Sequence, residues 1–177
     1  LGVQANVWTE HMRSFARVQH AIFPRIAALA ETAWSPRAAK NWGGFVARLP
    51  TQLQRYRAMG IAYAQTPFEV RSALVADRKQ GKVRVSLSNQ LGYAGMRYTT
   101  DGGDPTAASA QYSAPFELKL PAELRAAVFV DGQALAAPTL RRIDAASLLT
   151  RSDDELAMCT GALMLRLEDD GPLEGER

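Results

Sequence analysis

The sequence predicts an α+β fold in which a β/α unit and further helices precede a small antiparallel β-sandwich. Three observations lead to this prediction. An apolar extended run, residues 2–8, is followed by segments with helical periodicity as far as residue 59. From about residue 80 the apolar period becomes two, which is typical of half-buried antiparallel strands. Glycine, proline and aspartate gather in the turn cluster at residues 100–106.

The composition is that of a globular chain. Of its 177 residues, 47% are hydrophobic and 22% are charged, which excludes a disordered or collagen-like chain. Pro24, Arg25 and Glu31 interrupt the best candidate for a membrane span, so we expect none. The single cysteine, Cys159, excludes an internal disulfide framework, and its ordinary role is that of a small core residue. The chain begins at Leu1 without a signal pattern, and we expect it to be a piece of a longer protein.

The net charge of +3 does not indicate a nucleic-acid partner, and we expect none. Lys and Arg are scattered, and their longest cluster is the pair Arg141 and Arg142. Residues 1–143 are net basic, whereas residues 144–177 are net acidic.

The first part of the chain predicts one strand and then helices. Val3, Ala5 and Val7 lie on one side of the predicted strand over residues 2–8, as suits a parallel β/α unit. The helical pattern of residues 15–34 is interrupted at Pro24, which we place at the start of a new helix. The second helix ends at Ser35-Pro36. The apolar face of this helix comprises Ile26, Leu29, Ala30 and Ala33.

A third helix is predicted from about Trp42 to Met59. Asn41 suits its N-cap and Gly60 the position after its end. We expect its inward face to comprise Phe45, Leu49, Leu53 and either Tyr56 or Met59.

The remaining chain predicts a β-sandwich and then a different module. Strands are expected over residues 83–88, 96–100, 112–119, 124–131 and 135–142. Near the end of the chain, Ser152 to Glu155 has the spacing of a capping box, and residues 163–167 alternate as a strand does. The predicted domains are therefore a helical domain over 1–66, a linker over 67–79, a sandwich over 80–143, and over 144–177 a linker with the start of a truncated module.

Trp8 and Glu10 are the sharpest candidates for function. A large aromatic and a carboxylate two residues apart follow the predicted parallel strand, which is where α/β barrels build active sites. The indole offers a flat apolar wall for a sugar ring, and the carboxylate accepts hydrogen bonds from sugar hydroxyls. From these residues alone, a buried tryptophan and a helix-initiating glutamate remain an alternative.

Three segments resemble one enzyme family. GVQANVWTE (residues 2–10), IFPRIAALAETAWS (22–35) and FVARLPTQLQRYRAMGIAY (45–63) resemble, in this order, the end of the catalytic barrel of family 20 glycoside hydrolases, the β-N-acetylhexosaminidases. MRYTTDGGDPTAASAQYSAPFEL (96–118) resembles the β-sandwich module appended to chitobiase-type members.

The resemblance implies a fold, an activity and a site. Residues 1–66 would be the last β/α unit and helices of a (β/α)8 TIM barrel, completed by the remainder of that barrel. The family removes terminal β-linked N-acetylglucosamine or N-acetylgalactosamine with retention, using the substrate's own acetamido group as nucleophile. Trp8 would wall the acetamido pocket, and Glu10 would bind the O4 and O6 hydroxyls. No cofactor is implied, the partners are N-acetylhexosamine-terminated glycans, and the location is periplasmic or secreted.

The family's catalytic Asp-Glu pair is missing from this stretch. In the family it follows a His-x-Gly-Gly context on an earlier strand, which does not occur here. Asp154-Glu155 lacks that context, and a capping box explains it. We therefore expect the 177-residue chain to have no hydrolase activity. We also expect residues 1–12 to be poorly ordered or repacked, and the apolar helix faces to be exposed, when this piece is studied alone.

The other candidates have simpler explanations. His11 and His20 have no neighbouring ligand cluster, so no metal site is expected. Asp101 and Asp104 lack the spacing of an EF-hand loop and suit a polar turn. A non-catalytic carbohydrate-binding or interaction module remains the alternative function, with Tyr93, Tyr98 and Tyr112 as the aromatic side chains that would support it if exposed.

Overall fold

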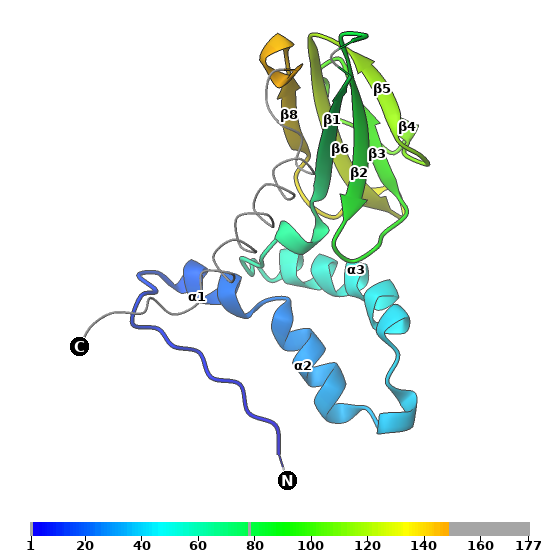
Figure 1. Cartoon of the computed structure of the whole chain (residues 1–177). Coiled ribbons are helices and arrows are strands. Elements are labelled where there is room, and N and C mark those ends of the chain that lie inside the picture. Colours follow the sequence, from blue (N-terminus) through cyan, green and yellow to red (C-terminus); the bar gives the residue numbers. More distant parts are fainter. Residues whose placement is uncertain (1, 78, 149–177) are drawn as a thin grey trace, which may run out of the picture.

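The computed structural model describes residues 2–77 and 79–148, which form a helical part and a β-sandwich (Figure 1). The helical part contains α1 (Phe15–Ile22), α2 (Arg25–Trp34), η1 (Arg37–Ala39), α3 (Trp42–Ala58) and η2 (Thr66–Phe68). The sandwich contains β1 (Val70–Asp77), β2 (Lys82–Asn89), β3 (Met96–Thr99), β4 (Ala110–Gln111), β5 (Phe116–Lys119), β6 (Ala122–Val130), β7 (Gln133–Ala134) and β8 (Thr139–Ile143), followed by η3 (Ala145–Leu148). In Figure 1, α3 lies across one end of the sandwich, with α1 and α2 beyond it.

The helices begin and end where the sequence predicts. Ser14 caps α1, since its side-chain oxygen accepts a hydrogen bond from the backbone N–H of Arg17 at 3.2 Å. Pro24 separates α1 from α2, although it stands at the N-cap of α2 rather than inside it. Asn41 caps α3 by accepting from the N–H of Gly44 at 3.0 Å, and Gly60 follows the helix with a φ of +67°.

The prediction of a strand over residues 2–8 is wrong for this chain. Residues 2–9 have no regular secondary structure and are exposed. A strand needs a neighbouring strand to pair its N–H and C=O groups, and no strand in the described part of the chain pairs with this segment. A lone β/α unit therefore does not form, and the described structure is a set of helices joined to an antiparallel sandwich.

The sandwich consists of two antiparallel sheets. One has the strand order β1-β2-β5, and the other contains β4-β3-β6-β7 with β8 also paired to β6. Val83, Val85 and Leu87 on β2 face inward and are buried, as their alternation predicts.

Three details of the sandwich differ from the sequence-based expectation. Strand β1 lies inside the segment 67–79 that was expected to be a linker, because apolar residues on both faces, such as the 43%-exposed Val75, hide its period of two. The strand expected over 112–119 contributes only β5, which starts directly after Pro115, a residue that cannot donate to a ladder. Of the strand expected over 135–142, only β8 forms, directly after Pro138, and β7 lies just before that range.

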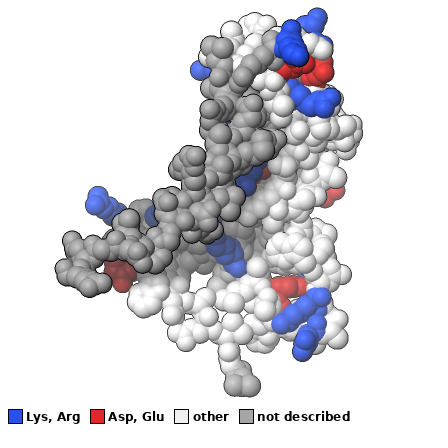
Figure 2. Space-filling model, in the orientation of Figure 1, with Lys and Arg blue, Asp and Glu red and all other residues white. Residues whose placement is uncertain are grey.

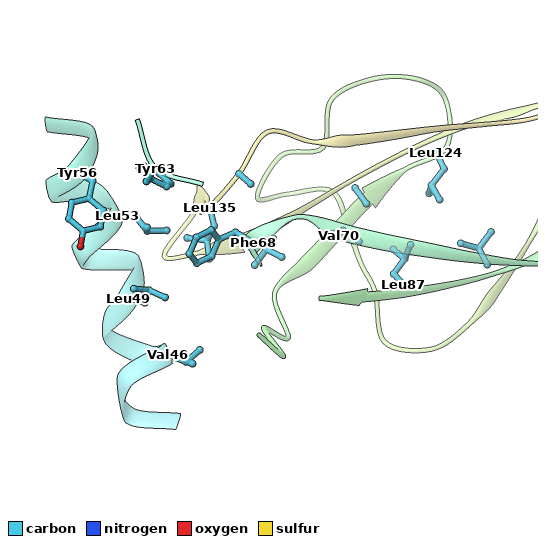
Figure 3. Close-up of a cluster of buried hydrophobic side chains, with 14 of the residues drawn as sticks. Val46, Leu49, Leu53, Tyr56, Tyr63, Phe68, Val70, Leu87, Leu124 and Leu135 are labelled. Carbon is cyan, nitrogen blue, oxygen red and sulfur yellow. The ribbon is translucent and has the colours of Figure 1, made fainter. Parts of the chain in front are cut away.

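A single hydrophobic core joins α3 to both sheets. Figure 3 shows Val46, Leu49 and Leu53 pointing from α3 toward the end of the sandwich, where Phe68 and Leu135 lie. The predicted inward face of α3 is confirmed, and it uses Tyr56 rather than Met59, whose side chain is 61% exposed. Because buried side chains of α3 and of the sandwich belong to the same hydrophobic cluster, we treat them as one packed unit.

The helix lengths and the surface charge of the described part also bear on the sequence-based expectations. None of the helices in the described part has the length and apolar character that a bilayer crossing requires. Lys and Arg form separate groups over the face seen in Figure 2 rather than a continuous stripe. The capping box at 152–155, the strand expected over 163–167, Asp154-Glu155 and Cys159 lie outside the described residues.

Candidate functional site

Trp8 lies at a hollow beside the first two helices. The hollow has a volume of about 460 Å³. Its lining comes from the N-terminal segment and from the junction of α1 and α2, and comprises residues 5–8, Met12, Ala21, Ile22, Arg25, Ile26 and Leu29. The Trp8 side chain is 71% exposed, so its indole is free to contact a ligand. The alternative of a buried tryptophan therefore does not hold in this chain.

Glu10 does not line this hollow. It lies in an exposed turn two residues further along, where the N–H of Met12 donates to the carbonyl of Thr9 at 2.9 Å. In the described chain, Trp8 and the helix junction thus line the same hollow, and Glu10 is not part of that lining. The role predicted for the pair stays a prediction.

Arg25 is a member of the hollow that the sequence did not reveal. Its guanidinium Nη1 donates to the backbone carbonyls of His20 at 3.2 Å and Ala21 at 3.1 Å, which belong to the last turn of α1. These carbonyls have no partner within the helix, and a cation suits the negative end of the helix dipole. Arg25 therefore links the start of α2 to the end of α1. The only hint in the sequence to the position of Arg25 was that it directly follows Pro24, which was predicted to start a helix.

A second hollow lies on another side of α2. It has a volume of about 600 Å³ and runs between α2 and α3, with Phe45, Leu49 and Tyr56 among its lining. Trp34, which is 89% exposed, also lines it, and the ion pair between Glu31 and Arg48 lies at this groove.

Much of the α2 apolar face is therefore open to solvent in this chain. Ile26 lines both hollows, and Ala30 and Ala33 are exposed, while Ala27 and Ala28 pack on the core. The expectation that apolar helix faces are exposed in this piece is confirmed. A contiguous exposed apolar surface of this kind marks a contact site in soluble proteins.

The titratable groups elsewhere do not assemble a metal site. In residues 2–77 and 79–148, no group of three or more His, Cys, Asp or Glu side chains comes together as a ligand set would. Asp101 accepts from the N–H of Gly103 at 3.0 Å, and Asp104 forms an ion pair with Arg125. Both aspartates therefore serve the predicted polar turn.

The tyrosines of the sandwich are used in packing. Tyr98 stacks on Phe116 with ring centroids 4.3 Å apart, and Tyr112 meets the same ring edge-on. The Tyr93 hydroxyl donates to the carbonyl of Val46 on α3 at 2.8 Å, and burial raises the pKa of Tyr93 to about 12. None of these three tyrosines is exposed as a free aromatic platform.

Two family models match the chain in order. Residues 1–37 match the glycosyl hydrolase family 20 catalytic domain, and residues 75–139 match the chitobiase/beta-hexosaminidase C-terminal domain. The catalytic-domain match thus precedes the C-terminal-domain match in the same chain. Trp8 and Glu10 lie in the range that the catalytic-domain model matches, whereas α3 lies between the two matched ranges.

Curated relatives carry the corresponding names. A beta-hexosaminidase of Porphyromonas gingivalis is 32% identical over 121 residues, which cover 66% of this chain and 15% of that protein. A beta-N-acetylhexosaminidase of Cellulomonas fimi is 30% identical over 67 residues, covering 38% of this chain and 14% of that protein. A beta-hexosaminidase of Akkermansia muciniphila is 34% identical over 53 residues, covering 30% and 11%. The chain thus spans at most 15% of the length of these relatives.

Proposed function

We propose that this chain is the C-terminal part of a retaining exo-β-N-acetylhexosaminidase. The complete enzyme removes terminal β-linked N-acetylglucosamine or N-acetylgalactosamine from glycans. One observation carries the proposal: the catalytic-domain match that contains Trp8 and Glu10 is followed, in the same chain, by the hexosaminidase C-terminal domain match. The names of the three relatives support the same reaction.

The proposed chemistry divides between this chain and the rest of the catalytic domain. In substrate-assisted hydrolysis the acetamido oxygen attacks the anomeric carbon and displaces the leaving oxygen, which a general acid protonates. That attack requires the acetamido group to be held under the sugar ring, which the Trp8 indole does as an apolar wall. Glu10 holds the sugar through its O4 and O6 hydroxyls. The general acid and the group that orients the acetamide come from outside these 177 residues.

The remaining barrel also explains the open apolar surfaces. We infer that residues 2–8 pair with neighbouring barrel strands in the complete enzyme and so form the strand of its last β/α unit. Those strands and their helices then cover the apolar groove between α2 and α3, which is lined by Ile26, Trp34 and Phe45. We propose an export route for the complete enzyme, with a periplasmic or secreted location.

The alternative function, a carbohydrate-binding sandwich, has less support. Its candidate tyrosines are packed against other rings or bonded to α3. A glycan titration of the 177-residue chain with Tyr98→Ala separates the two functions, since binding that is lost in the variant would favour the module.

The decisive experiment compares this chain with a longer protein that carries the complete catalytic domain. The longer protein is expected to hydrolyse 4-nitrophenyl N-acetyl-β-D-glucosaminide, and the 177-residue chain is not. In the longer protein, Trp8→Ala removes a wall worth about 1.5–3 kcal/mol, so kcat/KM falls roughly 10- to 150-fold. Glu10→Gln is expected to lower it by a similar factor, because hydrogen bonds to a charged group are lost.

Trp42→Ala is the matched control. Trp42 is 62% exposed and lines neither hollow, so its removal should leave kcat/KM unchanged. Equal activity of wild type, Trp8→Ala and Glu10→Gln would exclude the proposed site, and no hydrolysis by the wild-type longer protein would exclude the proposed reaction.

A further inference from the structure

Arg57 joins α3 to the sandwich through a set of hydrogen bonds that no other side chain in the described residues matches. Its Nη2 donates to the carbonyls of Ala134 at 3.0 Å and Leu135 at 2.8 Å, at the end of β7. Its Nε donates to the Tyr63 hydroxyl at 2.8 Å, and its guanidinium carbon lies 6.0 Å from the centre of the Tyr63 ring. Hydrogen bonds from a charged donor are among the stronger ones in proteins.

The β6–β7 hairpin that Arg57 contacts is well defined. Its two-residue turn, Asp131-Gly132, has φ angles of +50° and +76°, as the tight Asp-Gly hairpin turn requires. Leu135 is 3% exposed and belongs to the shared core, and its N–H donates to the carbonyl of Val128 at 2.9 Å. Arg57 therefore contacts a hydrogen-bonded hairpin next to the shared core.

A continuous set of contacts leads from Arg57 to the junction of α1 and α2. The Tyr63 ring lies 6.1 Å from the Tyr56 ring, which meets the Phe23 ring edge-on at 4.9 Å. Next to Tyr63 in the chain, the N–H of Ala64 donates to the carbonyl of Phe23 at 2.9 Å. Phe23 directly follows α1 and precedes Pro24 at the start of α2.

The same junction forms one side of the Trp8 hollow. Ala21 and Ile22 from the end of α1, and Arg25 and Ile26 from the start of α2, line it together with Trp8. We propose that Arg57 is a positioning residue through which the C-terminal sandwich holds in place this helix junction, which lines the hollow together with Trp8. The expected effect of Arg57 on sugar binding rests on the proposed function. The structural link between the sandwich and the helix junction does not depend on that function.

The first test measures kinetics in the longer protein with the complete catalytic domain. Arg57→Met keeps the length of the side chain and removes its donors. We expect KM for 4-nitrophenyl N-acetyl-β-D-glucosaminide to rise roughly 2- to 30-fold with little change in kcat. Arg57→Lys keeps one charged donor and should restore part of the difference. Arg84→Met is the control, since the Arg84 side chain is exposed on β2 and makes no hydrogen bond within the described residues.

The second test measures amide exchange by NMR in the 177-residue chain and needs no activity. In Arg57→Met the amides of Phe23 and Ala64 should accelerate more than those of Val83 and Val85 in β2, whose acceleration reports only the change in global stability. Tyr63→Phe, which removes only the hydroxyl, should change the same two amides less and serves if Arg57→Met does not fold.

The outcomes separate the two proposals. An inactive wild-type longer protein with faster exchange at Phe23 and Ala64 in the variant refutes the proposed function and supports the link. Unchanged KM together with unchanged exchange at these amides overturns the link. Equal acceleration of all amides, with a lower kcat and the same KM, would show that Arg57 contributes only to global stability, and would also overturn it.

Discussion

Leu53→Ala tests whether α3 and the sandwich form one cooperative unit. Leu53 is fully buried at 0% exposure, and Figure 3 shows it pointing from α3 toward Leu135 and Phe68. The substitution removes three carbon atoms, worth about 0.8 kcal/mol each, and leaves a cavity that adds about 1 kcal/mol. The expected loss of unfolding free energy is therefore roughly 3–4 kcal/mol, equivalent to a Tm lower by about 10 °C.

The assay is hydrogen exchange with mass spectrometry, read separately on peptides from α3 and from β2. If the two share one core, Leu53→Ala lowers the free energy of opening by the same amount in both peptides. Met59→Ala, at the exposed end of the same helix, should change stability by less than about 0.5 kcal/mol. Loss of protection in α3 while β2 keeps its wild-type protection would refute the idea of a single unit.

Three further predictions follow from individual contacts. Tyr93→Phe removes the hydrogen bond to the Val46 carbonyl, and we expect a loss of about 1 kcal/mol in urea unfolding. Burial raises the pKa of Tyr93 to about 12, so the unfolded chain loses this proton first; stability should fall from about pH 10 to pH 12 more steeply in wild type than in Tyr93→Phe, and equal slopes would contradict the assignment. Asn41→Ala removes the cap on the Gly44 N–H and should cost about 1 kcal/mol by thermal unfolding; an unchanged Tm would show that the cap contributes nothing. Glu31→Gln breaks the ion pair with the 63%-exposed side chain of Arg48, and a change above about 1 kcal/mol would contradict its placement at the surface.

The sequence predicted the helices well because their limits are local. Asn41 at the start of α3, Gly60 after its end and Ser35 after α2 act on backbone groups within a few residues. The buried face of α3 and the alternation in β2 were also predicted correctly, because the apolar period repeats over several helical turns in α3 and over several residues in β2.

The failures concern interactions between distant parts of the chain. The run at residues 2–8 has the composition of a strand, yet a strand forms only beside another, and the described chain offers no partner to it. Strand β1 was missed because Ala73 and Val75 point outward and mask its alternation. The contact of Arg57 with the sandwich could not be predicted from the sequence, because the carbonyl groups that accept its hydrogen bonds lie 77 and 78 residues away in the chain.

The candidate site was only partly predictable for the same reason. Trp8 was found from its place after a predicted strand and from the family resemblance, and it does line a hollow. Arg25 shares that hollow but bonds to backbone carbonyls, which every sequence contains. Glu10 stays outside the lining in this chain, where the neighbouring barrel strands of the proposed enzyme are absent from the sequence.

A crystal structure of the longer protein with bound N-acetylglucosamine tests the central proposal most directly. We expect the Trp8 indole in van der Waals contact with the acetamido methyl group and the Glu10 carboxylate within hydrogen-bond distance of the O4 and O6 hydroxyls. A sugar bound at the catalytic domain with both side chains remote from it would contradict the account.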